Sequence, residues 1–296
     1  MMKIGIDSYC FHRFFGELYP GQEAPEKPMT MDDFLDFSKS LGVDGVSLES
    51  CFMPGAKPGD ESGIDNGWLR ELKAKLDGYG FDRVYAWGHP DGLERGKNPQ
   101  AFKDMMESIP RAALIGAPVM RVCGSSLMFR NEPRGPQIKA LVAQFKEAMK
   151  VADEYGGIKI ANENHIDYTA DEMVQMIEEV GHPNFGINFD TGNFLRLLDD
   201  PIEGMEKLAK YTFATHIKDL AYNPLAKPND WYFFSGVPVG RGVIDNYKLA
   251  ELLKKANYQG FLAAEIDWPH PDWVNCEHEA VSISVKTLKD IVKRLG

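Results

Sequence analysis

The sequence predicts an α/β protein that folds as one (β/α)8 TIM barrel. Short apolar runs of strand type alternate with amphipathic helical segments, eight of each, along the 296 residues. No glycine-rich nucleotide loop follows the first strand and no linker divides the chain, which favours a closed barrel over an open doubly wound sheet. Such a barrel takes about 250 residues, so we expect residues 1–296 to form a single domain.

The expected strands are short apolar runs, several of which end in a carboxylate. They are Lys3–Asp7, Gly45–Glu49, Asp82–Trp87, Pro118–Cys123, Ile158–Glu163, Phe185–Asp190, Phe213–Lys218 and Gly260–Ile266. The expected helices repeat apolar residues at helical spacing, and some have a capping residue before them or glycine after them. They are Thr30–Leu41, Trp68–Leu76, Ala101–Ile115, Ile138–Tyr155, Asp171–Val180, Ile202–Ala209, Tyr247–Ala256 and His278–Leu295.

Two connections are much longer than the others, at about residues 8–29 and 221–243. The first begins with a run of aromatic residues, and the second is rich in proline, glycine and aromatic residues. Loops of more than about 12 residues in a compact domain are often functional, so we expect both to be ordered loops near a site.

Composition and charge narrow the class of function. The chain is 44% hydrophobic and 26% charged, as in soluble proteins with a sizeable core. Its net charge of −11 argues against binding to nucleic acid or to an anionic membrane. The four cysteines lack metal-binding spacing, and neither a signal peptide nor a membrane span is apparent. We therefore expect a cytoplasmic protein with reduced thiols.

Four residues that can bind a metal or transfer a proton lie at the ends of the last four expected strands. They are Glu163, Asp190, His216 and Glu265. Consecutive strand ends of a barrel meet at one mouth, so these side chains are expected to converge. Three carboxylates there would repel one another, and a divalent cation would remove the repulsion. Oxygen ligands with one imidazole suit Mn²⁺, Mg²⁺, Co²⁺ or Zn²⁺. The alternative is that each residue pairs separately with Lys or Arg.

The motifs around these residues resemble the xylose-isomerase-like superfamily of sugar phosphate isomerases and epimerases. The motifs are NENH (162–165), NFDTGN (188–193), THIKD (215–219), PVGRG (238–242) and GFLAAEI (260–266). The resemblance implies that Glu163, Asp190, His216 and Glu265 bind one divalent ion, with Mn²⁺ favoured. It also implies that Glu163 and Glu265 move protons through an ene-diolate during isomerisation or epimerisation of a sugar.

Two positions depart from the ketose 3-epimerases of that superfamily. Asn193 stands where they tend to carry a substrate-binding His, and Tyr222 where they tend to carry Arg. His165 is available as an additional catalytic base or as a hydrogen-bonded neighbour of the metal. These departures keep open a second reaction, the β-elimination of 3-keto C- or O-glycosides by the catalytic subunit of a two-subunit lyase.

Further residues are candidates for binding a small sugar or glycoside. Asn193, Lys218, His12, Trp87 and Arg121 are expected around the mouth as substrate-binding residues. Lys218-Asp219 is also a candidate to orient His216, because ligating imidazoles donate their second N–H to an acceptor. A last group of aromatic residues could stack on a sugar or an aglycone, or simply anchor the loops or a partner subunit: Trp231, Tyr232, Phe233, Phe234, Trp268 and Trp273. We expect a homo-oligomer, joined by a small second subunit if the protein is the lyase.

Two other classes of function stay as alternatives. An apurinic-site endonuclease shares this fold, but it uses three zinc ions and more histidines, and the charge of −11 opposes DNA binding. A non-catalytic sugar-binding protein would lack a bound ion and be indifferent to EDTA.

Overall fold

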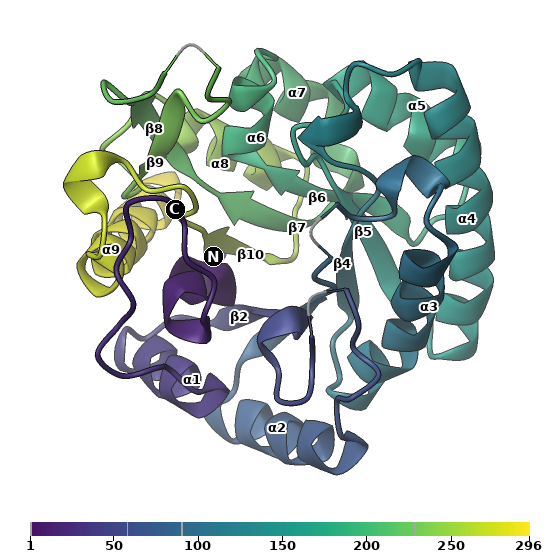
Figure 1. Ribbon diagram of the computed structural model, residues 1–296, viewed down its shortest axis with the longest axis horizontal. Helices are drawn as coiled ribbons and strands as arrows, with labels where there is room; N and C mark the ends of the chain where they lie inside the picture. The colour runs from purple at the N-terminus through teal and green to yellow at the C-terminus, as the bar shows by residue number, and fades with distance from the viewer. Residues whose placement is uncertain (1, 58, 90, 228) are drawn as a thin grey trace.

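The structure, a computed structural model, describes residues 2–57, 59–89, 91–227 and 229–296. Within these residues, eight parallel strands close into a barrel in the order β1-β10-β7-β6-β5-β4-β3-β2 (Figure 1). The barrel strands are β1 (Lys3–Asp7), β2 (Gly45–Glu49), β3 (Asp82–Ala86), β4 (Val119–Cys123), β5 (Lys159–Glu163), β6 (Phe185–Asp190), β7 (Thr212–Ile217) and β10 (Phe261–Ala264). The predicted closed barrel is therefore confirmed, with strand boundaries that shift by at most two residues.

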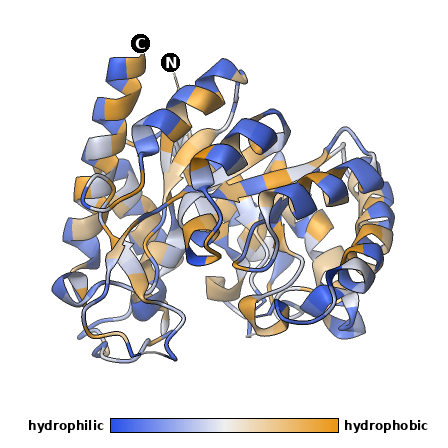
Figure 2. Cartoon of the chain, turned by 90° about the horizontal axis from the view of Figure 1, so that it is seen from above, coloured by the Kyte–Doolittle hydropathy of each residue, from blue (hydrophilic) through white to orange (hydrophobic). Residues whose placement is uncertain are grey.

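Helices surround the barrel, and orange and blue residues alternate along them because one face packs inward (Figure 2). They are α1 (Met31–Ser40), α2 (Asn66–Tyr79), α3 (Pro99–Leu114), α4 (Arg134–Glu154), α5 (Ala170–Val180), α7 (Pro201–Leu208), α8 (Asn246–Lys255) and α9 (Glu277–Leu295). Thr30 and Thr169 each begin a helix with a capping box, in which side chain and backbone exchange hydrogen bonds. Among the described residues, none of the helices combines the length and apolar character that crossing a membrane requires.

Several short elements were not predicted, and four of them lie near the barrel mouth or in the long connections. The segment Ser8–Phe15 forms a 3-10 helix, whose first turn is capped by the Asp7 carboxylate and which ends at Gly16 with φ of +99°. A one-turn helix, α6 (Thr191–Arg196), follows β6 directly. The long connection after β7 contains an antiparallel pair, β8 (Asp219–Tyr222) and β9 (Phe234–Val237). Short elements of this kind have little periodicity, so their sequences look like loops.

The barrel interior has its own small core, separate from the large core between strands and helices. Its buried members are Val84, Val119, Ala161, Ala214, Phe261 and Ala263, from five strands. Bulky branched residues usually fill this space in (β/α)8 barrels. Here three of the six are alanines, so the middle of the barrel is loosely filled, which matters for a cavity described below.

Candidate metal centre

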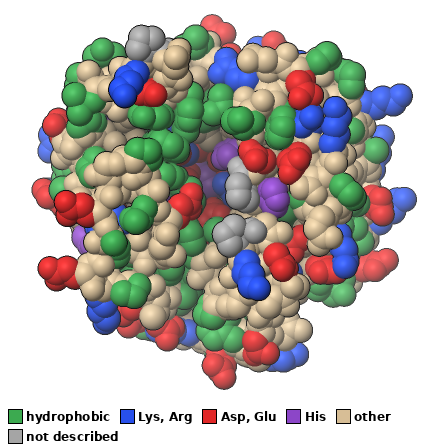
Figure 3. All heavy atoms as spheres, viewed as in Figure 1, with side chains coloured by type: hydrophobic (Ala, Val, Ile, Leu, Met, Phe, Trp, Pro, Cys, Tyr) green, Lys and Arg blue, Asp and Glu red, His purple; other side chains and the backbone are tan. Residues whose placement is uncertain are grey.

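The four side chains predicted from the strand ends meet at one point. Glu163, Asp190, His216 and Glu265 are all buried, and one potential ligand atom from each lies within 4.8 Å of the others. Strand pairing explains this, because Asp190 on β6 lies beside His216 on β7, and Ala263, two residues before Glu265, also lies beside His216. Figure 3 shows a hollow over the barrel where acidic, basic and histidine side chains gather.

Asp190 uses its two carboxylate oxygens differently. Oδ1 accepts hydrogen bonds from the backbone N–H groups of Gly192 and Asn193, both at 2.8 Å, and so begins helix α6. This cap fixes the side chain and leaves Oδ2 facing the cluster, 3.9 Å from His216 Nδ1. The unpredicted helix α6 is therefore part of what orients this residue.

One ring nitrogen of His216 faces the cluster, and the other faces an aspartate. Nδ1 lies 2.7 Å from Glu265 Oε2 and 3.4 Å from Glu163 Oε2. Nε2 lies 3.2 Å from Asp7 Oδ2, and both groups are buried. An acceptor at Nε2 favours the tautomer with its proton there, which leaves Nδ1 free as a ligand atom.

Asp7 was missed as a site residue, although strand β1 ends in it just as other strands end in their candidate residues. Asp219, which the sequence suggested as the group orienting His216, has a different role. Its carboxylate accepts N–H groups from Gly240, Gly242 and Ile244 at 2.9–3.0 Å. It therefore holds the connection after β9 in place, and the expectation that it orients His216 is wrong.

Two buried cations flank the cluster. Arg121 donates through Nε to Glu163 Oε2, and its Nη1 lies 3.4 Å from Glu49 Oε1. Lys218 Nζ lies 2.8 Å from Asp190 Oδ2 and 3.4 Å from Glu265 Oε2. Each acidic residue of the cluster thus has a cation near it, but the two cations are shared among several carboxylates.

Lys218 is also tied to a second buried ion pair. Its Nζ lies 2.8 Å from Asp267 Oδ2, and Asp267 accepts two hydrogen bonds from Arg196 at 2.7 and 2.8 Å. The side chain of Arg196 is fully buried. Neither Arg196 nor Asp267 was predicted, because the sequence offers no spacing signal that joins α6 to the residues after β10.

The pKa values in the cluster reflect burial and these neighbours. Burial alone would raise the pKa of Glu163, but Arg121 and His216 outweigh it and hold that pKa well below its usual range. Burial raises the pKa of Asp190 to about 7, against the opposing effect of Lys218. Burial would lower the pKa of His216, but the carboxylates of Glu265 and Glu163 raise it well above its usual value. The site as a whole attracts positive charge.

The donor set fits a divalent ion. Asp190 Oδ2, His216 Nδ1 and Glu265 Oε2 are buried, and none forms a hydrogen bond of acceptable geometry with the described residues. Lys218 Nζ nevertheless lies close to Asp190 Oδ2, and His216 Nδ1 lies close to Glu265 Oε2. Buried polar atoms without partners are uncommon and point to an unfilled role. Carboxylate oxygens with one imidazole match Mn²⁺, Mg²⁺, Co²⁺ or Zn²⁺.

His165 lies beside this cluster on a strained turn. Its Nδ1 is buried without a hydrogen-bond partner among the described residues, and burial lowers the pKa of its imidazole. The next residue, Ile166, has φ of +58°, an unfavourable value for a β-branched side chain. Asp167 stabilises the turn by accepting the N–H groups of His165 and Tyr168, both at 2.8 Å. Strain of this kind is often retained at functional sites.

The other predicted substrate-binding residues lie in different surroundings. Asn193 Nδ2 donates to Glu163 Oε1 at 3.2 Å, so it adjoins the cluster. His12 contacts the Glu17 carbonyl at 2.7 Å through Nδ1 and packs on Tyr19, with ring centroids 4.1 Å apart. Trp87 is fully buried, and its Nε1 donates to Asp104 of α3 at 2.9 Å, which holds the indole toward that helix.

Some of the predicted aromatic residues form a wall at the mouth. Trp268 stacks on Tyr19 at 4.3 Å and on Tyr232 at 4.7 Å, and Trp231 meets it edge-on at 4.7 Å. The wall therefore joins the connection after β1 to the hairpin of β8 and β9. Trp268 has φ of +40° and directly follows Asp267. Trp273, in contrast, packs against the main core.

Comparison with known proteins places this barrel in a family. A family model described as xylose isomerase-like TIM barrel matches residues 35–290. The chain belongs to the xylose isomerase-like TIM barrel family. This membership confirms the resemblance that the motifs indicated and agrees with the closed barrel of the structure.

Three similar proteins were found by sequence or by structure. An inosose dehydratase from Mesomycoplasma hyopneumoniae is 24% identical over 273 residues, covering 84% of this chain and 86% of that protein. A 3-oxo-isoapionate decarboxylase from Pectobacterium atrosepticum is 24% identical over 129 residues, so the match spans 43% of this chain and less than half, 46%, of that relative. The crystal structure of an IolI protein with a bound zinc atom has a TM-score of 0.73 at 17% identity, covering 100% of this chain and 99% of that one.

Proposed function

We propose that the protein is a divalent-metal-dependent isomerase or epimerase of small sugars, which moves a proton at the carbon next to a carbonyl. The convergence of Glu163, Asp190, His216 and Glu265 within 4.8 Å is the observation that supports it most. These four residues would hold the ion, and the zinc atom in the IolI structure is in line with such a site on this fold. We retain Mn²⁺ as the favoured ion. When bound, the ion would polarise the substrate carbonyl and stabilise negative charge that develops beside it.

The chain itself supplies two carboxylates to move the proton. Arg121 and Asn193 each donate to one oxygen of Glu163, which fixes the orientation of that carboxylate. Glu265 follows β10, which is separated from β5 by β6 and β7 in the barrel. The two carboxylates therefore reach the substrate position from different directions. This arrangement suits removal of a proton on one face of a carbon and its return on the other.

A second reaction, β-elimination from a 3-keto glycoside, is favoured by two observations. Among the residues that the structure describes, the imidazole of His165 has no partner at Nδ1, so it is available beside the cluster as a base or acid for a leaving group. One relative is named as a dehydratase, and removal of water next to a ketone is chemically the same elimination with a smaller leaving group. In this case the aromatic wall would face the aglycone, and a small second subunit would complete the enzyme.

The two reactions are separated by their products. The protein, loaded with Mn²⁺, is incubated with free ketohexoses and in parallel with a 3-keto glycoside, and the products are resolved by chromatography. Epimerised or isomerised sugar that disappears after EDTA treatment is the expected result. Released aglycone without any change in the free sugars contradicts the first proposal and supports the elimination. Activity that persists in the variant E265Q and in EDTA contradicts the metal centre itself.

A further inference from the structure

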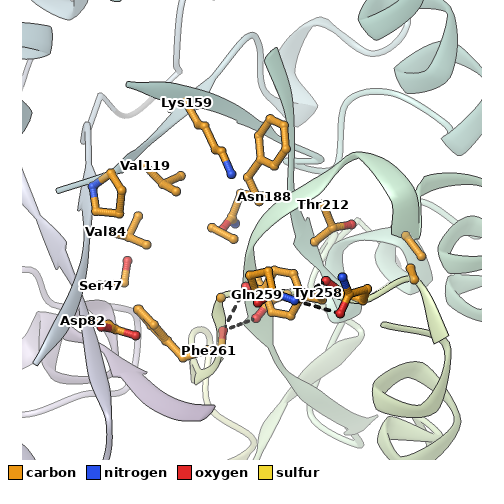
Figure 4. A pocket seen from close by; sticks show the side chains of 18 of the residues that line it. Ser47, Asp82, Val84, Val119, Lys159, Asn188, Thr212, Tyr258, Gln259 and Phe261 are labelled. Carbon is orange, nitrogen blue, oxygen red and sulfur yellow. Dashed lines mark hydrogen bonds between the residues drawn. The ribbon is translucent and has the colours of Figure 1, made fainter. Parts of the chain in front are cut away.

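A cavity of about 350 Å³ opens at the end of the barrel opposite the metal centre (Figure 4). Its walls include the first residues of three strands, namely Asp82 of β3, Lys159 of β5 and Phe261 of β10. The candidate ligands lie within one residue of the other ends of their strands. The cavity therefore opens at the opposite end of the barrel from the mouth, and its inner wall reaches Asn188, which lies beside Glu163 on the neighbouring strand.

Four residues of the small barrel core line this space, namely Val84, Val119, Ala214 and Phe261. The ring of Phe261 fits only because Gly5 and Gly45 have no side chain, since a Cβ atom there would come within 2.4 and 2.6 Å of it. A space of this size is at the lower end of ligand-binding pockets, which favours a small ligand.

An unpartnered amide faces the cavity. Asn188 lines it from β6 and is fully buried, yet neither its Nδ2 nor its Oδ1 has a hydrogen-bond partner in the described part of the chain. Leaving a buried amide unpaired is unfavourable, so such groups are normally satisfied by protein, water or ligand. In Figure 4 the amide of Asn188 and the amine of Lys159 point into the same space.

The charge that faces the cavity is positive. Lys159 has no carboxylate partner among the described residues, and its amine lies 4.8 Å from the centroid of the Phe213 ring. Asp82, the acidic group of the lining, is paired with Lys3 at 2.5 Å. Arg83 is turned to Asp77 at 2.7 Å and to backbone carbonyls. Lys159 and Lys210, which also lines the cavity, are therefore cations of the lining without a carboxylate partner in the described part of the chain, and an anion would complement their charge.

We infer that this cavity binds a small carboxylate with a short apolar tail. The carboxylate accepts hydrogen bonds from the Lys159 amine and the Asn188 amide, and the tail contacts Val84, Val119 and Phe261. The Lys159 amine and the Asn188 Nδ2 then each have an acceptor of suitable chemistry.

The test measures the binding of butyrate to the metal-loaded protein by ligand-observed NMR and calorimetry. Butyrate is expected to bind saturably, and its neutral isostere butyramide at least tenfold more weakly. Lys159→Met should weaken butyrate binding at least tenfold, and Asn188→Leu should also weaken it. The control variant Lys146→Met, which removes an exposed charge of helix α4, should leave it unchanged.

Three outcomes overturn the inference. The first is the absence of saturable binding, which would mean that only water fills the cavity. The second is binding that survives Lys159→Met but is lost in Glu265→Gln, which would place butyrate at the metal centre. The third is binding of inorganic phosphate without binding of butyrate. Folding of each variant is checked by circular dichroism, and Asn188→Leu provides an independent test if Lys159→Met does not fold.

Discussion

The contact between Asp7 and His216 predicts how strongly the protein binds its ion. Asp7→Asn keeps the size of the side chain and an oxygen that can accept the Tyr9 N–H, so the 3-10 helix after β1 should persist. The variant loses the carboxylate that lies 3.2 Å from His216 Nε2, and both groups are fully buried. The imidazole is then free to take the other tautomer, in which Nδ1 carries the proton and cannot bind an ion.

Loss of such a carboxylate behind a ligating histidine typically weakens metal binding 10–100-fold. This corresponds to about 1.4–2.7 kcal/mol. Competition with a fluorescent chelator measures the affinity for Mn²⁺ and Zn²⁺. The control is Asp44→Asn, which alters a carboxylate that accepts the Ile4 N–H at the opposite end of β1. Equal metal affinity in the wild type and in a folded Asp7→Asn protein would refute the assignment of Asp7.

Further predictions concern stability and the neighbouring histidine. Arg196→Ala leaves Asp267 buried without its bidentate partner, so the free energy of unfolding in urea should fall by about 3–5 kcal/mol. The control Lys207→Ala removes one member of an exposed ion pair and should change that free energy by less than about 1 kcal/mol. Burial raises the pKa of Glu61 from 4.5 to about 7, so the folded protein keeps a proton that the unfolded chain releases. The free energy of unfolding should therefore fall as pH rises from 4.5 to 7, by up to about 3 kcal/mol, and Glu61→Gln should flatten that part of the curve; an unchanged curve would exclude Glu61 as its source. His165→Ala should abolish or strongly reduce turnover but leave metal content intact, as measured by mass spectrometry; loss of the metal would show that the ligand set is wrong.

Much of the fold could be predicted because alternating strands and helices leave a strong periodic signal. The hairpin of β8 and β9 could not, because Pro224 lies in its loop, Pro238 directly follows it, and its strands have only four residues each. The 3-10 helix Ser8–Phe15 depends on a cap from Asp7 and on the packing of its aromatic rings. Neither of these leaves a period in the sequence.

The candidate ligands were predictable because a barrel brings strand ends together whatever the details of packing. Their role as ligands stays a prediction, but their convergence follows from topology. The partners of these residues were not predictable. Asp7 lies more than 200 residues before His216, and Arg196 reaches Asp267 from a helix that the sequence pattern did not indicate. Which carboxylate contacts which cation depends on rotamers and depth, and spacing along the chain does not encode these.

The divided use of Asp190 links the metal centre to the backbone after β6. One carboxylate oxygen faces the cluster, and the other caps the first turn of helix α6. A change in the position of the first oxygen therefore alters the hydrogen bonds of the second. Loading of the centre should therefore slow the hydrogen exchange of the Gly192 and Asn193 amides. Helix α6 also carries Arg196, whose partner Asp267 precedes the aromatic wall. A change in the ion could thus reach the aromatic wall through a helix of six residues.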